Sequence, residues 1–125
     1  MQPVLVTTRA KATVLGIEQE HDLAFPVLWH APVSKQPRHY AISVVKKNQH
    51  ADILASAGIF CIHFCNQELL QLALTQPLQP ALIGQCETID CHKLVNEPHL
   101  ECETVHTLDL GDHYLLVGKV LLAKE

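Results

Sequence analysis

Two cations and three polar side chains stand together where a largely apolar segment ends. In order they are Lys46, Lys47, Asn48, Gln49 and His50. Residues 40–45 indicate the end of a buried strand, and Asn48 is a good N-cap for a following helix. A helix start offers free amide donors and a partial positive charge, to which the lysines add two whole charges. This arrangement suits a phosphate, although a solvated turn is the alternative because exposed lysine pairs are common.

A second chemical pattern is the alternation of thiol and imidazole in the segment CIHFC. Cys61, His63 and Cys65 would all face one side of a strand. Thiolate and imidazole are zinc ligands, so a metal- or redox-sensing site is one interpretation. The sequence has no CxxC pair, and free cysteines also behave as small buried apolar residues. We therefore favour packing in the core for these side chains and expect no metal.

Patterns typical of two other chemistries are missing from the sequence. It contains no Gly-x-Ser-x-Gly segment of a hydrolase, no GxGxxG fingerprint and no GxxxxGK phosphate loop. Any catalysis must therefore rest on another arrangement, or on a cofactor that carries the chemistry.

Most of the elements that must position these residues read as strands. The expected strands cover residues 3–8, 23–33, 38–45, 58–64, 81–94, 99–110 and 114–123. The segment 23–33 carries Pro26 and Pro32, so it is expected at a sheet edge or with a bend. Gly111 and Asp112 separate the last two strands and predict a hairpin turn.

Two short segments read as helices. The first, residues 48–57, starts at Asn48 and stops at Gly58, and the second, residues 66–76, starts at Asn66 and stops at Pro77. Most strands are adjacent in sequence to a strand with which they can pair. The fold class is therefore mostly β: a small antiparallel barrel with two short helices.

Composition limits the kinds of function that this chain can have. Its 125 residues suit one domain over residues 1–125, with 48% hydrophobic and 18% charged residues. The net charge is −4 and the lysines and arginines are scattered, so no nucleic-acid partner is expected. No segment is apolar enough to span a membrane. Five cysteines, an odd number, fit reduced thiols in the cytoplasm.

Three segments together resemble the flavin reductase-like family, the FMN-binding split β-barrels. They are PVLVTTR (3–9), WHAPVSKQPRHYAISVVKKNQHADILASAGIFCIHF (29–64) and LECETVHTLDLGDHYLLVGKV (100–120). The resemblance covers most of the chain and rests on the order and spacing of these segments. It implies a split barrel that dimerises and holds FMN near the subunit interface, commonly with NAD(P)H as the reductant.

The resemblance also assigns roles to individual residues. Residues Phe25, Pro26, Val27 and Leu28 match the segment that lines the flavin ring. Lys47 and Gln49 match positions near the FMN phosphate, and Lys46, Asn48 and His50 flank them. His63 matches an Asn of the family, and His113 matches a His on the substrate side. Side chains alternate along a strand, so only one of the two lysines should reach the phosphate, and the resemblance favours Lys47.

The sequence departs from the family at the residues that would contact the flavin. Pro26 and Leu28 stand where relatives usually have hydroxyl residues, Gln49 replaces Thr, and His63 replaces Asn. Pro26 has no amide hydrogen and Leu28 has no side-chain donor, so flavin contacts would lose about 1 kcal/mol or more for each missing hydrogen bond. The chain is also shorter than most relatives.

The leading hypothesis is an FMN-binding homodimer with NAD(P)H-linked flavin reductase or related flavin-dependent oxidoreductase activity. In it, His113 polarises the substrate or donates to the nicotinamide amide; the alternative for His113 is an exposed turn residue. Two other hypotheses remain open: a non-enzymatic barrel with weak or lost flavin binding, and a Cys/His metal- or redox-sensing protein.

Overall fold

The computed structural model describes residues 2–47 and 49–125. Its main sheet contains seven strands: β1 (Val4–Val14), β2 (Ile17–Val27), β3 (Trp29–Lys35), β4 (Arg38–Val45), β5 (Ile59–His63), β8 (His99–Asp109) and β9 (His113–Lys124). A second sheet pairs β6 (Ile83–Gln85) with β7 (His92–Leu94). The helices are α1 (Gln49–Ala57) and α2 (Gln67–Thr75), and a 3₁₀ turn, η1, covers Pro80–Leu82.

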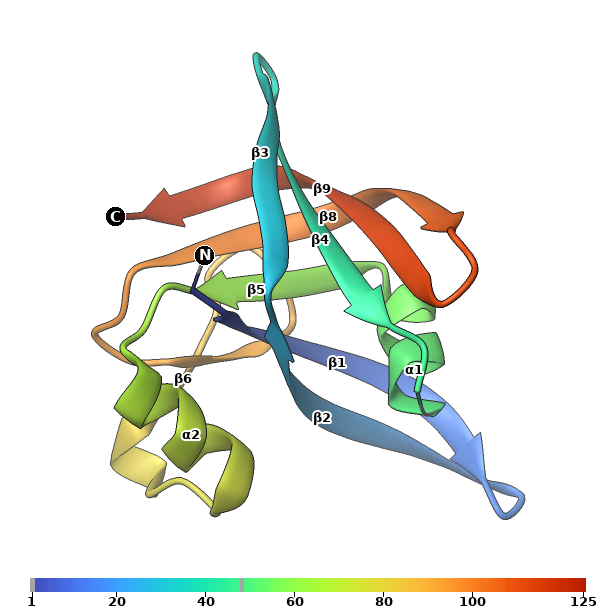
Figure 1. Ribbon diagram of the computed structural model, residues 1–125. Coiled ribbons are helices and arrows are strands. Elements are labelled where there is room, and N and C mark those ends of the chain that lie inside the picture. Colours follow the sequence, from blue (N-terminus) through green and yellow to red (C-terminus); the bar gives the residue numbers. More distant parts are fainter. Residues whose placement is uncertain (1, 48) are drawn as a thin grey trace.

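The main sheet curls because its two edge strands follow each other in sequence. Its order is β2-β1-β5-β8-β9-β4-β3, and every neighbouring pair is antiparallel. The edge strands β2 and β3 are separated only by Leu28. Since one residue cannot span a flat sheet of this width, the sheet bends round into a barrel-like shape, and β3 rises from the end of β2 (Figure 1).

The interior of the curled sheet is filled by side chains from every strand except β3. The core lies around Phe60, Ile62 and Leu116, which are fully buried. Helix α1 packs against β1 and closes one end of the core with Ala51 and Leu54. Helix α1 therefore has a fixed position relative to β4, which immediately precedes it.

The opposite face of β1, β5 and β8 is also covered, so this part of the sheet is buried on both sides. Helix α2 and the small β6–β7 sheet lie over it (Figure 1). Asn66 caps α2, since its Oδ1 accepts a hydrogen bond from the Leu69 N–H at 2.8 Å. Under this cover the sheet places polar side chains in one buried layer: Thr7, His63, His99 and Glu101.

The mostly β, antiparallel fold expected from the sequence is confirmed, as are the two short helices. The segment with Pro26 and Pro32 forms both sheet edges and the bend between them. The hairpin between β8 and β9 turns at Gly111, which has a φ of 97°. In the part of the chain that the structure describes, no helix is long and apolar enough to cross a membrane.

Two expectations about individual elements were wrong. Residues 81–94 were expected as one strand, but they contain η1, β6, a turn and β7, because the chain folds back at residues 87–90. The strand expected at 3–8 extends to Val14 and pairs with β2 along its whole length. The two strands join at Leu15 and Gly16, whose φ angles of 53° and 78° suit a type I′ turn.

Candidate functional site

The two lysines at the end of β4 have different surroundings. The Lys46 Nζ lies 2.8 Å from Asp109 Oδ1 and 4.8 Å from the centre of the Tyr114 ring. The Lys46 amide also donates to the carbonyl of Asp112 at 2.9 Å. The hydrogen bond with Asp109 raises the pKa of Lys46, and the same contact lowers the pKa of Asp109. The charge of Lys46 is therefore already matched by a carboxylate.

Lys47 is exposed and precedes α1 by one residue that lies outside the described part of the chain. It has no hydrogen bond or ion pair with any residue that the structure describes. The two lysines therefore have different contacts, and that they point to opposite sides stays a prediction. Asn48, the expected cap, lies outside the described residues, and so does the side chain of Gln49. His50 is in the first turn of α1.

A stacked pair of rings lies at the junction of β2 and β3. The Trp29 and His113 rings have centroids 4.8 Å apart and planes inclined by 26°. The His113 Nδ1 lies 2.8 Å from Asp112 Oδ1, and this hydrogen bond lowers the pKa of Asp112. His113 is thus held from two sides, by an indole and by a carboxylate, while Trp29 remains 56% exposed.

The stretch from Phe25 to Leu28 divides between the core and the surface. Val27 is buried and Phe25 packs against the same core cluster, whereas Pro26 and Leu28 are exposed. The Phe25 ring also meets the His50 ring edge-on, with centroids 6.3 Å apart. The structure therefore leaves Pro26 and Leu28, rather than the whole stretch, exposed to a ligand.

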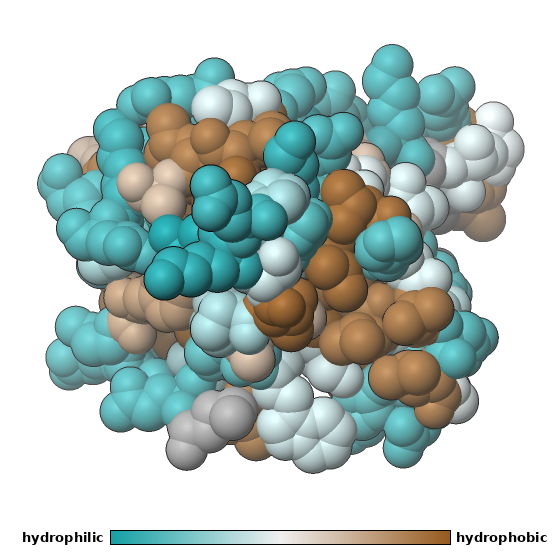
Figure 2. Space-filling view, turned by 90° about the horizontal axis from the view of Figure 1, so that it is seen from above, coloured by the Kyte–Doolittle hydropathy of each residue, from teal (hydrophilic) through white to brown (hydrophobic). Residues whose placement is uncertain are grey.

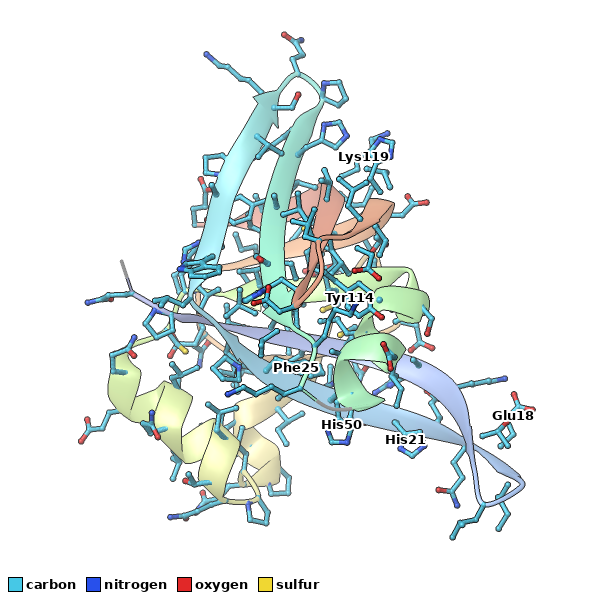
Figure 3. All side chains as sticks on the ribbon, turned by 45° about the vertical axis from the view of Figure 1, so that its right-hand side comes forward. Glu18, His21, Phe25, His50, Tyr114 and Lys119 are labelled. Carbon is cyan, nitrogen blue, oxygen red and sulfur yellow. The ribbon has the colours of Figure 1, made fainter. Side chains whose placement is uncertain are left out.

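Three parts of the chain that are far apart in sequence meet at this end of the molecule: the β2–β3 junction, the connection from the end of β4 to the start of α1, and the start of β9. Val45 of β4 pairs with His113 of β9, and Tyr114 donates to the Asp52 carboxylate of α1. Figure 3 shows Phe25, His50 and Tyr114 around α1. All the expected site residues that the structure describes belong to these segments, except His63.

An apolar row lies across the outer face of the strands beside this region. Trp29 pairs with Ser43, Ser43 with Leu115, and Leu115 with Leu108, so the four side chains share one face of β3, β4, β9 and β8. Leu108 is 51% exposed. Seen from above, hydrophobic side chains form a patch on the right-hand half of the visible face (Figure 2).

His63 is not brought to this surface. It is completely buried on β5, where its Nδ1 donates to the Leu5 carbonyl and its Nε2 accepts from the Leu94 amide, both at 3.1 Å. Burial lowers the pKa of His63 to about 4, so the ring is neutral at physiological pH. Its Nε2 ties β7 of the cover to the sheet, while its Nδ1 bonds to β1 within the sheet.

The Cys61, His63 and Cys65 pattern does not form a metal site. Cys61 packs with Ile89 and Cys91, whereas Cys65 packs with Leu5, Leu70 and Leu94 in a different cluster. Among the described residues, no group of three or more His, Cys, Asp or Glu side chains is placed to hold a metal ion. Packing in the core, the favoured interpretation of the cysteines, agrees with these contacts.

Sequence reasoning missed the residues that support the expected ones. Trp29, Asp109 and Tyr114 contact His113 and Lys46, although none was a candidate. The sequence could reveal only one of the supporting contacts, that of Asp112 with His113, because these two residues are adjacent. The contact between Lys46 and Asp109 spans 63 positions and depends on the register of β4 with β9, which the sequence does not reveal.

Comparison with known proteins supports the fold assignment, and this support comes only from the similarity to solved structures. No protein-family model and no curated protein matches the sequence. Among solved structures, an FMN-binding protein from Thermus thermophilus with bound p-hydroxybenzaldehyde is similar with a TM-score of 0.78 and 21% identity, over 99% of this chain and 71% of that one. The flavin reductase HpaC complexed with NADP⁺ is similar with a TM-score of 0.73 and 22% identity, over 99% and 78% of the two chains.

A third similar structure is BorF, the flavin reductase component of a bacterial two-component tryptophan halogenase. Its TM-score is 0.74 and its identity is 19%, over 98% of this chain and 78% of that one. The chain therefore has the fold of flavin reductases and FMN-binding proteins. The resemblance seen in the sequence is confirmed at the level of the fold.

Proposed function

We propose that this chain binds FMN and acts as an NAD(P)H-linked flavin reductase or a related flavin-dependent oxidoreductase. The observation that carries the proposal is the contrast between the two lysines. Lys46 is engaged by Asp109, whereas Lys47 is exposed and has no partner among the described residues. An unmatched cation beside a helix start, in a fold shared with FMN-binding proteins, is suited to a phosphate.

The phosphate would lie between Lys47 and the first turn of α1. The amides at the start of a helix have no partner within the helix, and they point toward the preceding residues. In this arrangement Lys47 supplies charge, and the first amides of α1 supply directed hydrogen bonds. Lys46 adds only to the local field, because its ammonium group stays on Asp109.

The flavin ring would lie against the exposed apolar side chains next to this point, Leu28 and Trp29, with His113, which stacks on Trp29, beside it. The site fits the phosphate end of FMN, at Lys47 and α1, better than the polar edges of the ring, since Pro26 has no amide hydrogen and Leu28 has no side-chain donor. FMN, when bound, supplies hydride transfer chemistry. The protein's part is to bind the cofactor, exclude water and position NAD(P)H, whose amide His113 would meet through its Nε2.

A second copy of the chain would complete the site. The outer row that contains Trp29 and Leu108 leaves large apolar side chains in water, which is typical of an interface. We therefore propose a homodimer of single-domain subunits, in the cytoplasm, the compartment that suits a protein with five free cysteines. Light scattering at micromolar protein should give twice the monomer mass of 13.9 kDa, and a monomer mass would contradict the dimer.

Substitution of each lysine in turn tests the proposed function. We expect Lys47→Ala to weaken FMN binding by roughly 1–3 kcal/mol, the usual value of a charge-assisted hydrogen bond. Lys46→Ala, the matched control, should weaken it much less, because it removes a side chain that already has a partner. Equal effects of the two substitutions would contradict the assignment of the phosphate to Lys47.

The absence of donors at Pro26 and Leu28 favours one alternative function, a barrel that has lost its flavin. The colour of the purified protein separates the two. A yellow protein with flavin absorbance supports the oxidoreductase. A colourless protein that does not respond to added FMN supports the non-enzymatic alternative.

A further inference from the structure

Three of the five cysteines lie together beneath the turn that joins β6 to β7. Cys61 and Cys91 are fully buried and pack with Ile89 in one cluster, and Cys86 and Ile59 pack against it. Cys86 is the only one of the three thiols that is partly exposed. These thiols are on the opposite side of the sheet from the barrel core, and the proposed flavin site does not use them.

The turn that carries two of these cysteines is held firmly in place. Both the amide and the hydroxyl of Thr88 donate to the buried Glu101 carboxylate at 2.7 Å. Asp90 forms an ion pair with Arg9 at 2.7 Å. The thiols of Cys86 and Cys91 are therefore kept in a constant relative position by contacts that do not involve the sulfur atoms.

The backbone brings Cys86 and Cys91 to a distance that a disulfide can span. The Cys86 amide donates to the Cys91 carbonyl at 2.9 Å, which continues the register of Gln85 with His92 by one residue pair. The pair makes one of the two hydrogen bonds of a full antiparallel pair, since the Cys91 amide donates to the Ile89 carbonyl at 3.0 Å. The Cα atoms of residues opposite each other in an antiparallel pair are about 4.5–5.5 Å apart. Disulfides join Cα atoms separated by about 4.4–6.8 Å. Cys61, on β5, has no such backbone pairing with Cys86.

The surroundings keep these thiols protonated at neutral pH. Contact with the Cys61 thiol, together with burial, raises the pKa of Cys86. Contact with Cys86 and burial raise the pKa of Cys91. Reaction through a thiolate is therefore slow near pH 7 and accelerates as the pH rises.

We propose that Cys86 and Cys91 are a redox-active pair that is oxidised by low-molecular-weight disulfides. Cys86, the partly exposed thiol, gives its proton to solvent base and attacks one sulfur of glutathione disulfide, and one glutathione thiolate leaves. Cys91 then loses its proton and attacks the Cys86 sulfur of this mixed disulfide, and the second glutathione leaves. The pair loses two electrons, which reduce one glutathione disulfide to two glutathione molecules.

The experiment exposes the fully reduced, folded protein to glutathione disulfide without oxygen, at several pH values between 7 and 9. The intact mass should fall by the mass of two hydrogen atoms when the pair is oxidised. The rate of this oxidation should rise about tenfold for each pH unit. Cleavage after glutamate separates the cysteines, since Glu68 and Glu87 leave Cys61, Cys86 and Cys91 on the peptides 21–68, 69–87 and 88–97. The expected product joins 69–87 to 88–97.

Three variants separate the steps. Cys86→Ser should abolish the reaction, and Cys91→Ser should stop it at a stable glutathione adduct on Cys86. Cys65→Ser, which changes a buried thiol in another cluster, should react as the parent does. The peptide map of the parent protein tests the proposal even if a variant fails to fold. The proposal would be overturned by a disulfide between peptides 21–68 and 69–87. It would also be overturned if glutathione disulfide oxidised the urea-unfolded protein but not the folded protein.

Discussion

Replacement of Glu101 by Gln should remove a large part of the stability of the β6–β7 cover. The Glu101 side chain is fully buried, and its carboxylate accepts four hydrogen bonds, from His99 Nε2, the amide and hydroxyl of Thr88, and the Glu87 amide. Glutamine has nearly the same size, but its amide nitrogen cannot accept a hydrogen bond. At least one of the two backbone amides, which are partly buried under the turn, then loses its acceptor on residue 101.

Two independent arguments give a similar magnitude for this loss. One or two partly buried donors that lose their acceptor cost up to about 1–3 kcal/mol each. Burial by itself would raise the pKa of Glu101, but the hydrogen bonds from Thr88, His99 and Glu87 outweigh it and lower this pKa to about 2, from an ordinary 4.5. A shift of this size corresponds to roughly 3 kcal/mol in the free energy of unfolding.

The pH dependence of this loss follows from the direction of the shift. Since the pKa is lower in the folded protein, the stabilisation is fully present above pH 4.5 and disappears as the pH falls toward 2. Urea denaturation should therefore show Glu101→Gln less stable than the parent by about 3 kcal/mol at pH 7, and by much less at pH 2.5. Glu103→Gln, an exposed neighbour on the same strand, is the control and should change stability little at either pH. A difference between parent and Glu101→Gln that stays constant from pH 7 to 2.5 would refute the reasoning.

Two further predictions concern the proposed site and the core. His113→Ala should slow flavin reduction by NAD(P)H by about tenfold or more in stopped-flow measurements. The control, His106→Ala on the same hairpin, should leave the rate unchanged. Equal rates for the parent and His113→Ala would mean that His113 is only a turn residue. Gly118→Ala should lower the free energy of unfolding by about 1–3 kcal/mol in urea denaturation. The reason is that the added Cβ would lie 2.5 Å from the Phe60 ring and 2.8 Å from the Cys102 Cβ. An unchanged midpoint of the urea transition would contradict the tight packing of β9 on β5 and β8.

The parts of the fold that the sequence predicted well are those fixed by local chemistry. Pro26 and Pro32 cannot donate ladder hydrogen bonds at their positions, and this alone predicted an edge or bent strand. Asn66 predicted its helix start in the same way. By contrast, the turn at Leu15 and Gly16 has no Asn-Gly or Asp-Gly signal, so the hairpin of β1 and β2 was missed.

The errors in the sequence interpretation share a physical cause, which is dependence on distant residues. The turn between β6 and β7 is held by Glu101, which belongs to β8, and the segment itself reads as one alternating strand. The different fates of Lys46 and Lys47 depend on Asp109, across the sheet. Alternation along β4 predicted that the lysines would differ, but only the three-dimensional register shows which of them is neutralised.

Parallel titrations of the parent protein with FMN and with riboflavin test the central claim most directly, because the two flavins differ only in the phosphate. Quenching of flavin fluorescence measures both affinities under the same conditions. If Lys47 and the start of α1 hold the phosphate, FMN should bind more tightly by roughly 1–3 kcal/mol, or about 5- to 150-fold. Equal affinity for the two flavins, or no binding of either, would contradict the account.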